Sequence, residues 1–389
     1  MLHLLRNASV FAPTPLGAVD ILLAGGQIAA IGPKLSAPSA GWPVEEHDLS
    51  GYVIVPGLVD LHAHLGGGGG EGGAHTRVPP LQLTALSLAG VTTTVGLLGT
   101  DGTTRSLADL LAVARGLEHF GVTALCYTGS YEVPPHTLTG SVRGDIVHVD
   151  RIVAVGELAL SDHRSSQPTL DELLRVGADA HVAGMMTGKA GVVHLHMGDG
   201  PRGLDLIRQA LATEIPARTW HPTHCNRNHA LWAEAKDLTK RGCFIDVTTG
   251  PDDEHGPGAV TAILDYLRSG YDPARLTLSS DGGGCFPDFD ADGVLLGMGV
   301  GSPATLLDTV RGLVAAGLPL NQALAPCTAT AATLFRLHTK GRVAVGADAD
   351  LVVLDQALNL RSTIANGRFL VRDGAPIVHG MFERPDRRS

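Results

Sequence analysis

Six residues of metal-ligating type each stand at the end of an apolar, strand-like run, although more than two hundred positions separate the first from the last. They are His62, His64, Glu157, His196, His224 and Asp281. Imidazole nitrogens and carboxylate oxygens are ligands that zinc and similar divalent ions prefer. If these runs are parallel neighbours, their ends meet at one rim. The pattern therefore predicts a divalent-metal site and favours a metal-dependent hydrolase.

His62 and His64 form a His-x-His motif at the end of the apolar run Val55–Leu61, which contains a Pro-Gly pair. Alternate residues of a strand point to the same face, so both imidazoles can bind one ion. The motif alone is common by chance. Its place directly after an apolar strand is what makes it informative.

Glu157 lies inside the apolar run Val153–Leu160. A carboxylate in such a run is costly unless it is paired or bound to metal. A salt bridge is the alternative, but no lysine or arginine follows until Arg164. We therefore interpret Glu157 as a carboxylate that bridges two metal ions.

Two further strand-like runs end in paired histidines, His194 with His196 and His221 with His224. In each pair we expect one histidine to be a ligand, His196 and His224, and the other to support it. Most remaining histidines are expected at the surface, among them His3, His47, His119, His338 and His379.

Asp281 follows the last of the strand-like runs. A single aspartate there is also typical of a helix cap. Because four histidines are expected at the same rim, we interpret Asp281 as a metal ligand and as the general acid/base.

Eight apolar runs alternate with helix-like segments through the middle of the chain. The runs span residues 58–62, 92–97, 123–127, 152–158, 192–196, 218–223, 244–248 and 276–280. This alternation predicts an α/β fold, a (β/α)8 TIM-type barrel over residues 57–339. The competing fold is a doubly wound open sheet, which usually has fewer strands and a nucleotide loop. The run Gly66–Gly70 lacks the Lys-Ser/Thr of such a loop.

The two ends of the chain show short strands without helical periodicity. Residues 1–56 and 340–389 are therefore predicted to form one small β-sandwich domain, because neither piece is long enough to bury a sheet face alone.

The composition limits the class of protein. The 389 residues are 44% hydrophobic and 17% charged, which suits a globular protein with one large and one small domain. A net charge of -10 argues against nucleic acid or an anionic membrane as partner. Five cysteines without a CxxC pair argue against disulfides. With no membrane-length apolar run and no signal-peptide pattern, a cytoplasmic location is expected.

These motifs together resemble the amidohydrolase superfamily and, within it, the isoaspartyl (β-aspartyl) dipeptidase family, over nearly the whole chain. The superfamily-level marks are the His-x-His motif and the closing segment Val343–Leu351. The more specific marks are the glycine run ending in Glu71, Gly96–Asp101, Thr128–Tyr131, Ser161–Ser165, His196–Asp199, Pro222–Asn228 and Ser279–Gly282.

The resemblance implies two divalent metal ions per chain, zinc, bridged by a carboxylate and a hydroxide. One ion would be held by His62, His64 and Asp281, the other by His196 and His224, with Glu157 between them. It also implies a small dipeptide substrate and a homo-oligomeric assembly.

The best-known relatives bridge their two metals with a carbamylated lysine. Here Glu157 stands in its place and would supply the same two oxygens. Lys189 precedes the fifth strand-like run, so we expect it at the opposite end of the barrel.

The resemblance also assigns substrate contacts. Glu71 would bind the α-ammonium of the β-aspartyl residue, and Arg164 and Arg227 would bind carboxylates through bidentate contacts. Tyr131 would donate a hydrogen bond to the oxyanion. Asp281 would pass the proton of the attacking hydroxide to the leaving amine.

Thr100 and Cys285 complete the expected substrate pocket. The family often has a serine where this chain has Cys285, and a thiol is a weaker hydrogen-bond partner. The resulting hypothesis is a binuclear hydrolase of β-aspartyl dipeptides. The alternatives are an amidohydrolase for a cyclic amide or an N-acyl amino acid, and a metal-free binding protein. Glu71 and the two arginines favour a zwitterionic peptide, and the six filled ligand positions disfavour a metal-free protein.

Overall fold

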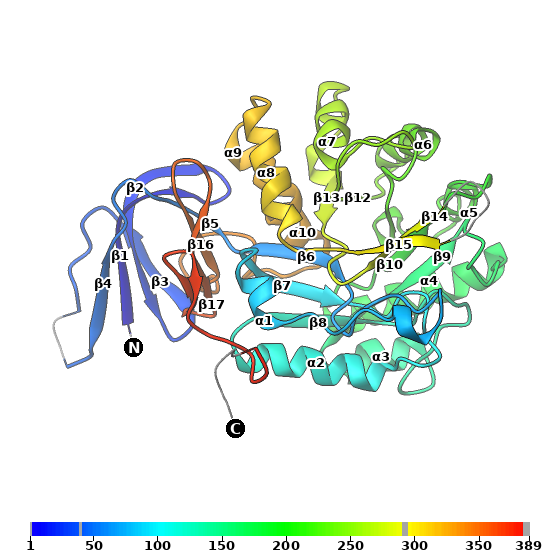
Figure 1. The fold of residues 1–389 in the computed structure, drawn as a ribbon, viewed down its shortest axis with the longest axis horizontal. Helices are drawn as coiled ribbons and strands as arrows, with labels where there is room; N and C mark the ends of the chain where they lie inside the picture. Colours follow the sequence, from blue (N-terminus) through cyan, green and yellow to red (C-terminus); the bar gives the residue numbers. More distant parts are fainter. Residues whose placement is uncertain (1, 39–40, 290–294, 384–389) are drawn as a thin grey trace.

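The computed structural model describes residues 2–38, 41–289 and 295–383. It contains a β-sheet built from both ends of the chain beside a larger α/β unit (Figure 1). Each of the eight runs predicted in the middle of the chain is a strand. These strands are β6 (Leu58–Ala63), β7 (Val91–Gly96), β8 (Thr123–Thr128), β9 (Ile152–Leu160), β10 (Val193–Met197), β11 (Trp220–Thr223), β12 (Ile245–Thr248) and β13 (Leu276–Ser279).

The eight strands form parallel ladders in chain order. Strands β6 to β11 make one curled six-stranded sheet, and β12 pairs with β13. The two sheets also touch each other at both ends. Between β11 and β12, the backbone N–H of Cys225, just after β11, donates to the carbonyl of Asp246 on β12 at 3.1 Å. Between β13 and β6, a parallel bridge joins Ala63 on β6 to Gly282, just after β13. The ends of β6 and β13 therefore lie side by side.

The helices lie between the strands, as the alternation predicts. They are α1 (Leu83–Ser87), α2 (Leu107–His119), α3 (Val142–His148), α4 (Leu170–Thr187), α5 (Asp205–Ala210), α6 (His229–Thr239), α7 (Ala259–Arg268), α8 (Thr305–Ala315), α9 (Leu320–Leu324) and α10 (Ala329–Leu334). Short 3-10 turns cover Ala74–Thr76, Ala217–Thr219, Pro273–Arg275 and Ala325–Cys327. Helix α4 begins with a reciprocal capping box between Thr169 and Glu172. Helices α3, α9 and α10 were not predicted from the sequence.

The terminal strands are β1 (Leu2–Phe11), β2 (Pro15–Ala24), β3 (Gln27–Gly32), β4 (Val44–Asp48), β5 (Val53–Pro56), β16 (Leu351–Leu354), β17 (Leu360–Ala365), β18 (Arg368–Arg372) and β19 (Ala375–Pro376). The sequence predicted a β-sandwich, in which two separate sheets pack face to face. The terminal strands are instead hydrogen-bonded into one continuous nine-stranded sheet. The reason is β5, which pairs with β1 on one side and with β16 on the other. The first and last parts of the chain are thereby joined in a single ladder.

This sheet is apolar on both faces near the α/β unit. Ile54 of β5 and Val353 of β16 belong to a core enclosed by the terminal strands. Their neighbours Val53, Val55 and Val352 belong to the large core of the α/β unit. Because alternate residues face opposite sides of a strand, β5 and β16 contribute to both cores and fix the sheet against the α/β unit.

A hairpin of β14 (Cys285–Phe289) and β15 (Leu295–Val300) follows β13 and was not predicted. It begins at the rim where Asp281 lies. In the described part of the chain, no helix is long and apolar enough to span a membrane.

Candidate metal centre

The six predicted ligands meet at the carboxyl ends of the parallel strands. They come from β6 (His62, and His64 just after it), β9 (Glu157), β10 (His196) and the turns that follow β11 (His224) and β13 (Asp281). All six side chains are buried, and Asp281 is the most exposed of them at 11%. Residues up to 219 positions apart therefore share one site, as the sequence predicted.

Glu157 lies at the middle of this group. Its Oε1 is 3.7 Å from Nε2 of His62 and 3.6 Å from Nε2 of His64. Its Oε2 is 3.2 Å from Nδ1 of His196 and 3.6 Å from Nε2 of His224. Each carboxylate oxygen thus faces a different pair of histidines, which is the geometry that a bridging ligand requires.

The Asp281 carboxylate lies next to the pair formed by His62 and His64. Its Oδ1 lies 3.3 Å from Nε2 of His62 and 3.1 Å from Nε2 of His64. Among the described residues, His62 Nε2 and Asp281 Oδ1 are buried without a hydrogen-bond partner, which is costly unless an ion satisfies them. Tetrahedral zinc with ligands at 2.0–2.2 Å separates its donor atoms by about 3.3 Å. The donor types and spacing therefore fit a divalent metal ion.

The electrostatics of the site favour anionic carboxylates. Burial opposes ionisation, but positive charge on His62, the hydrogen bond with His196 and the nearby His224 hold the pKa of Glu157 well below its usual value. Burial likewise opposes ionisation of Asp281, and His62 and His64 hold its pKa far below the usual value. In turn, Glu157 and Asp281 outweigh burial and raise the pKa of His62 to about 9. Two ionised carboxylates in a buried group of imidazoles attract a cation.

Three residues that shape the rim have a left-handed backbone: Ser161 (φ 51°), His224 (φ 57°) and Asp281 (φ 52°). This region is uncommon for residues other than glycine and costs on the order of 1–3 kcal/mol at each position. Such residues cluster at functional sites, because there the turn must aim one side chain. At His224 and Asp281 the turned side chain is a candidate ligand.

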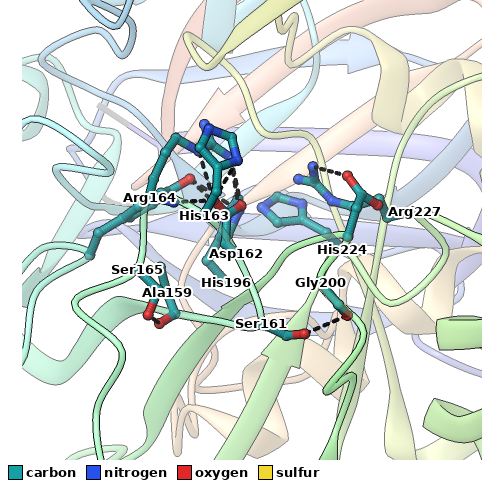
Figure 2. Close-up of polar contacts among 12 residues, drawn as sticks. Ala159, Ser161, Asp162, His163, Arg164, Ser165, His196, Gly200, His224 and Arg227 are labelled. Carbon is teal, nitrogen blue, oxygen red and sulfur yellow. Dashed lines mark hydrogen bonds and ion pairs between the residues drawn. The ribbon is translucent and has the colours of Figure 1, made fainter.

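Asp162 connects the candidate ligand His196 to Arg164, a predicted substrate-binding residue (Figure 2). The sequence did not predict a role for it. Its Oδ2 is 3.1 Å from Nε2 of His196. Its two oxygens also accept from Nε and NH2 of Arg164 at 3.0 and 2.8 Å. The signal that could have found it is the acid–arginine spacing within Ser161–Ser165. Asp162 therefore orients both residues.

The histidine of each pair that is not a candidate ligand, His194 or His221, lies behind the candidate ligands. His194 Nε2 is 2.9 Å from Nδ1 of His62, and its Nδ1 is 3.0 Å from Nδ1 of His221. His221 Nε2 then contacts the Thr277 hydroxyl at 2.9 Å. This chain of contacts fixes the orientation of the His62 ring, which is the supporting role expected of a partner histidine.

Above the candidate ligands opens a cavity of about 590 Å³. It is lined by all the predicted substrate residues: Glu71, Thr100, Tyr131, Arg164, Arg227 and Cys285. Within it, Glu71 Oε1 is 3.4 Å from NH1 of Arg164. Arg227 NH1 is 3.6 Å from Asp199 Oδ2. Of the predicted substrate residues, one carboxylate and two guanidinium groups therefore face the same space, which Asp101, Arg105, Asp162 and Asp199 also line.

Tyr131 and Cys285 take positions that the sequence did not specify. The Tyr131 hydroxyl is 2.8 Å from Nδ1 of His196, at the inner end of the cavity. The Cys285 Sγ is 3.8 Å from Sδ of Met298 on the hairpin. Burial raises the pKa of the Cys285 thiol, so Cys285 enters the cavity as a neutral group.

The glycine run before Glu71 passes close to other backbone segments, which leaves no room for side chains. A Cβ on Gly67 (φ +80°) would lie 1.9 Å from the carbonyl oxygen of Val78, and one on Gly69 (φ +74°) would lie 2.5 Å from that of Thr76. Arg105 donates to the carbonyls of Gly66 and Gly68. The run is therefore a packed loop that carries Glu71 to the cavity rim.

Lys189 lies at the other end of β9, as predicted. Its ammonium group donates to the carbonyls of Ile146, Val149 and Ile152 at 2.6, 2.8 and 3.0 Å. Ile152 begins β9, whereas Glu157 lies near the end of that strand. Lys189 is therefore held away from the candidate metal centre.

Comparison with known proteins places this geometry in context. The amidohydrolase family model matches residues 53–377. The crystal structure of β-aspartyl dipeptidase from Fervidobacterium islandicum AW-1 in complex with β-Asp-Leu dipeptide is 42% identical, with a TM-score of 0.92 and 97% of each chain covered. A second structure of that enzyme is 41% identical, with a TM-score of 0.89 over 97% of this chain and 98% of the other.

More distant similarities share the fold. Dihydropyrimidinase from Brevibacillus agri NCHU1002 has a TM-score of 0.68 at 18% identity, with 98% of this chain and 97% of that chain covered. Adenine deaminase 2 from Rhizobium johnstonii is 23% identical over 367 residues, which is 92% of this chain and 54% of that protein. The chain thus spans about half the length of that relative.

Proposed function

The chain belongs to the amidohydrolase family, and from this premise we propose that it is a binuclear metal-dependent dipeptidase that hydrolyses β-aspartyl (isoaspartyl) dipeptides. The proposal is supported by 42% identity, over 97% of both chains, to a β-aspartyl dipeptidase crystallised with β-Asp-Leu.

The observation that carries the proposal is the charge pattern of the cavity. Glu71, Arg164 and Arg227 line it together with the candidate ligands. Of the other charged lining residues, Asp162 and Asp199 pair with the two arginines. Arg105 donates to backbone carbonyls. A β-aspartyl dipeptide has one free ammonium and two carboxylates, which complement one glutamate and two arginines. A neutral cyclic amide needs no ammonium site. This pattern favours the dipeptide over the cyclic amide substrates of other amidohydrolases.

The donor set suits divalent metal ions such as zinc. We propose that two would be held here, one by His62, His64 and Asp281 and the other by His196 and His224, with Glu157 as the ligand common to both. When bound, such ions lower the pKa of a shared water and polarise the scissile carbonyl.

The protein's own groups supply the remaining chemistry. Asp281 accepts the proton of the attacking water and delivers it to the leaving amine. The Tyr131 hydroxyl donates a hydrogen bond to the oxyanion that forms on the scissile carbonyl. Arg164 already has two of its nitrogens bound to Asp162, so its NH1, next to Glu71, is the nitrogen left to bind a substrate carboxylate.

The test is a comparison of substrates with the metal-loaded protein. β-Asp-Leu, α-Asp-Leu and the cyclic amide dihydrouracil are assayed under the same conditions. The proposal predicts the highest kcat/KM for β-Asp-Leu. The α-linked isomer carries the same charges at the wrong spacing, so it should be a poor substrate. Faster hydrolysis of dihydrouracil would support the cyclic-amide alternative and refute the dipeptidase.

The proposal extends to the architecture. We propose that the eight parallel strands close into a (β/α)8 barrel over residues 57–339, supported by the bridge between Ala63 and Gly282. Residues 1–56 and 340–389 would then form the small β domain. As in the family it resembles, the chain would work as a homo-oligomer, which light scattering of the purified protein tests.

A further inference from the structure

A second group of metal-ligating side chains lies on the terminal sheet, apart from the candidate metal centre. His3 is on β1, and Glu45 and His47 are on β4. The two strands are parallel, with His3 opposite Glu45 and Leu5 opposite His47. Because alternate residues share a face of a strand, His3, Glu45 and His47 lie on the same face of this strand pair. None of the three belongs to the motifs assigned to catalysis.

The donor atoms of these three residues are close together. His3 Nδ1 is 3.2 Å from His47 Nε2, and 3.5 Å from Oε2 of Glu45. His47 Nε2 is 3.8 Å from Oε1 of Glu45. One donor atom from each residue can be chosen so that all lie within 4.8 Å of one another. Ligands of a tetrahedral zinc ion are separated by about 3.3 Å, so modest side-chain rotations would complete the triangle.

Neighbouring side chains hold this triangle in place. The Phe369 ring of β18 packs against both imidazoles, with centroids at 5.1 Å from His3 and 4.8 Å from His47. Arg372 lies over the same ring at 4.6 Å, and its NH1 binds Oε1 of Glu45 at 3.0 Å. This ion pair orients the Glu45 carboxylate so that Oε2 faces His3.

The sequence predicted His3 and His47 at the surface, and this was wrong. Their side chains are only 12% and 14% exposed. Both imidazole rings are largely covered because β4 pairs with β1 and Phe369 packs on the two rings. Glu45 remains 38% exposed, so an ion can reach the group from solvent on that side.

We propose that His3, Glu45 and His47 bind one divalent transition-metal ion, such as Zn²⁺, with water in the fourth position. Two imidazoles and one carboxylate favour zinc, nickel or copper over calcium or magnesium. The positive charge of Arg372 opposes the cation, so this site fills at a higher free zinc concentration than the two-carboxylate centre.

The ion would act as a cross-link within the sheet. In the described strands, β4 is hydrogen-bonded to β1 alone. An ion held by one ligand from β1 and two from β4 would therefore fasten this strand by side chains as well as backbone. Any ligand that binds only the folded state raises the unfolding temperature, so the role assigned to this ion is stabilisation.

The first test measures zinc content in the intact enzyme. Wild type, His3→Gln and His47→Gln are equilibrated with the same zinc buffers, and bound zinc per chain is determined. His119→Gln is the matched control, because His119 is exposed on α2. Wild type and the control should hold one zinc more than the two variants, with equal turnover in all four. Equal zinc content in all four proteins would overturn the proposal and leave a hydrogen bond between two histidines.

The second test does not depend on variants that might fold poorly. Crystals of the wild-type enzyme grown with zinc are measured on both sides of the zinc absorption edge. An anomalous peak is expected about 2.0–2.1 Å from His3 Nδ1 and His47 Nε2. Absence of that peak refutes the proposal. Peaks at Glu157 report separately on the proposed catalytic metals, so failure of one site is distinguishable from failure of the other.

Discussion

The Glu71→Gln substitution removes one negative charge from the cavity while keeping the size of the side chain. In the structure, Glu71 Oε1 is 3.4 Å from NH1 of Arg164 and its side chain is 26% exposed. Arg164 keeps its two contacts with Asp162 in the variant, at 3.0 and 2.8 Å, so its guanidinium should not move. The change therefore removes the proposed contact with the α-ammonium of the substrate together with the Glu71–Arg164 ion pair.

The size of the effect follows from that contact. A hydrogen bond between charged groups contributes about 1.5–3 kcal/mol, which corresponds to about a ten- to hundredfold loss in kcat/KM. Partial exposure of Glu71 screens the interaction, so the lower half of this range is expected. Zinc content should not change, because Glu71 is not among the candidate ligands.

The assay is steady-state hydrolysis of β-Asp-Leu by zinc-loaded protein, with zinc measured on the same samples. Glu132→Gln is the matched control: Glu132 is 44% exposed and pairs with His136 at 2.7 Å, outside the cavity lining. The control should keep wild-type kcat/KM. If Glu71→Gln also keeps it, Glu71 is a solvated loop residue and the assignment of an ammonium site is wrong.

Three further predictions concern the metal centre and the fold. Asp281→Asn should lower kcat at least about a hundredfold, because an amide cannot transfer the proton; near-normal turnover with zinc retained would remove Asp281 from the mechanism. Apo-protein reconstituted with zinc in carbon-dioxide-depleted buffer should regain full activity, because the Glu157 carboxylate needs no carbamylation; a strict bicarbonate requirement would point to Lys189 instead. Lys340→Met should lower the free energy of unfolding by about 3–5 kcal/mol, because Lys340 Nζ pairs with buried Asp350 at 2.6 Å; urea unfolding measures this, and a loss below about 1 kcal/mol would contradict it.

The candidate ligands could be predicted from sequence because their signal is local. Each is a polar or charged residue in or directly after an apolar run, where a buried strand usually has only apolar residues. Glu157 in β9 is an example. Parallel strands then bring those ends to one rim whatever their separation in the chain. The same logic found all eight strands, since continuous apolar runs are typical of strands buried on both faces.

What could not be predicted depends on contacts between distant residues. Asp162 has its role because His196, 34 positions away, lies beside it. The nine strands at the chain ends form a single sheet because β5 has neighbours from both ends. His3 and His47 are half-buried because Phe369 packs on them. None of these partners is visible in the periodicity of the segment concerned.

The most direct test of the account compares β-Asp-Leu with its N-acetylated form as substrates of the zinc-loaded wild-type protein. Acetylation removes the α-ammonium and leaves the scissile β-linkage unchanged. If Glu71 binds that ammonium, the acetylated peptide should lose at least about tenfold in kcat/KM, the low end for a charged hydrogen bond. If the acetylated peptide is instead the better substrate, the enzyme is a deacylase of N-acyl amino acids and the proposed function is wrong.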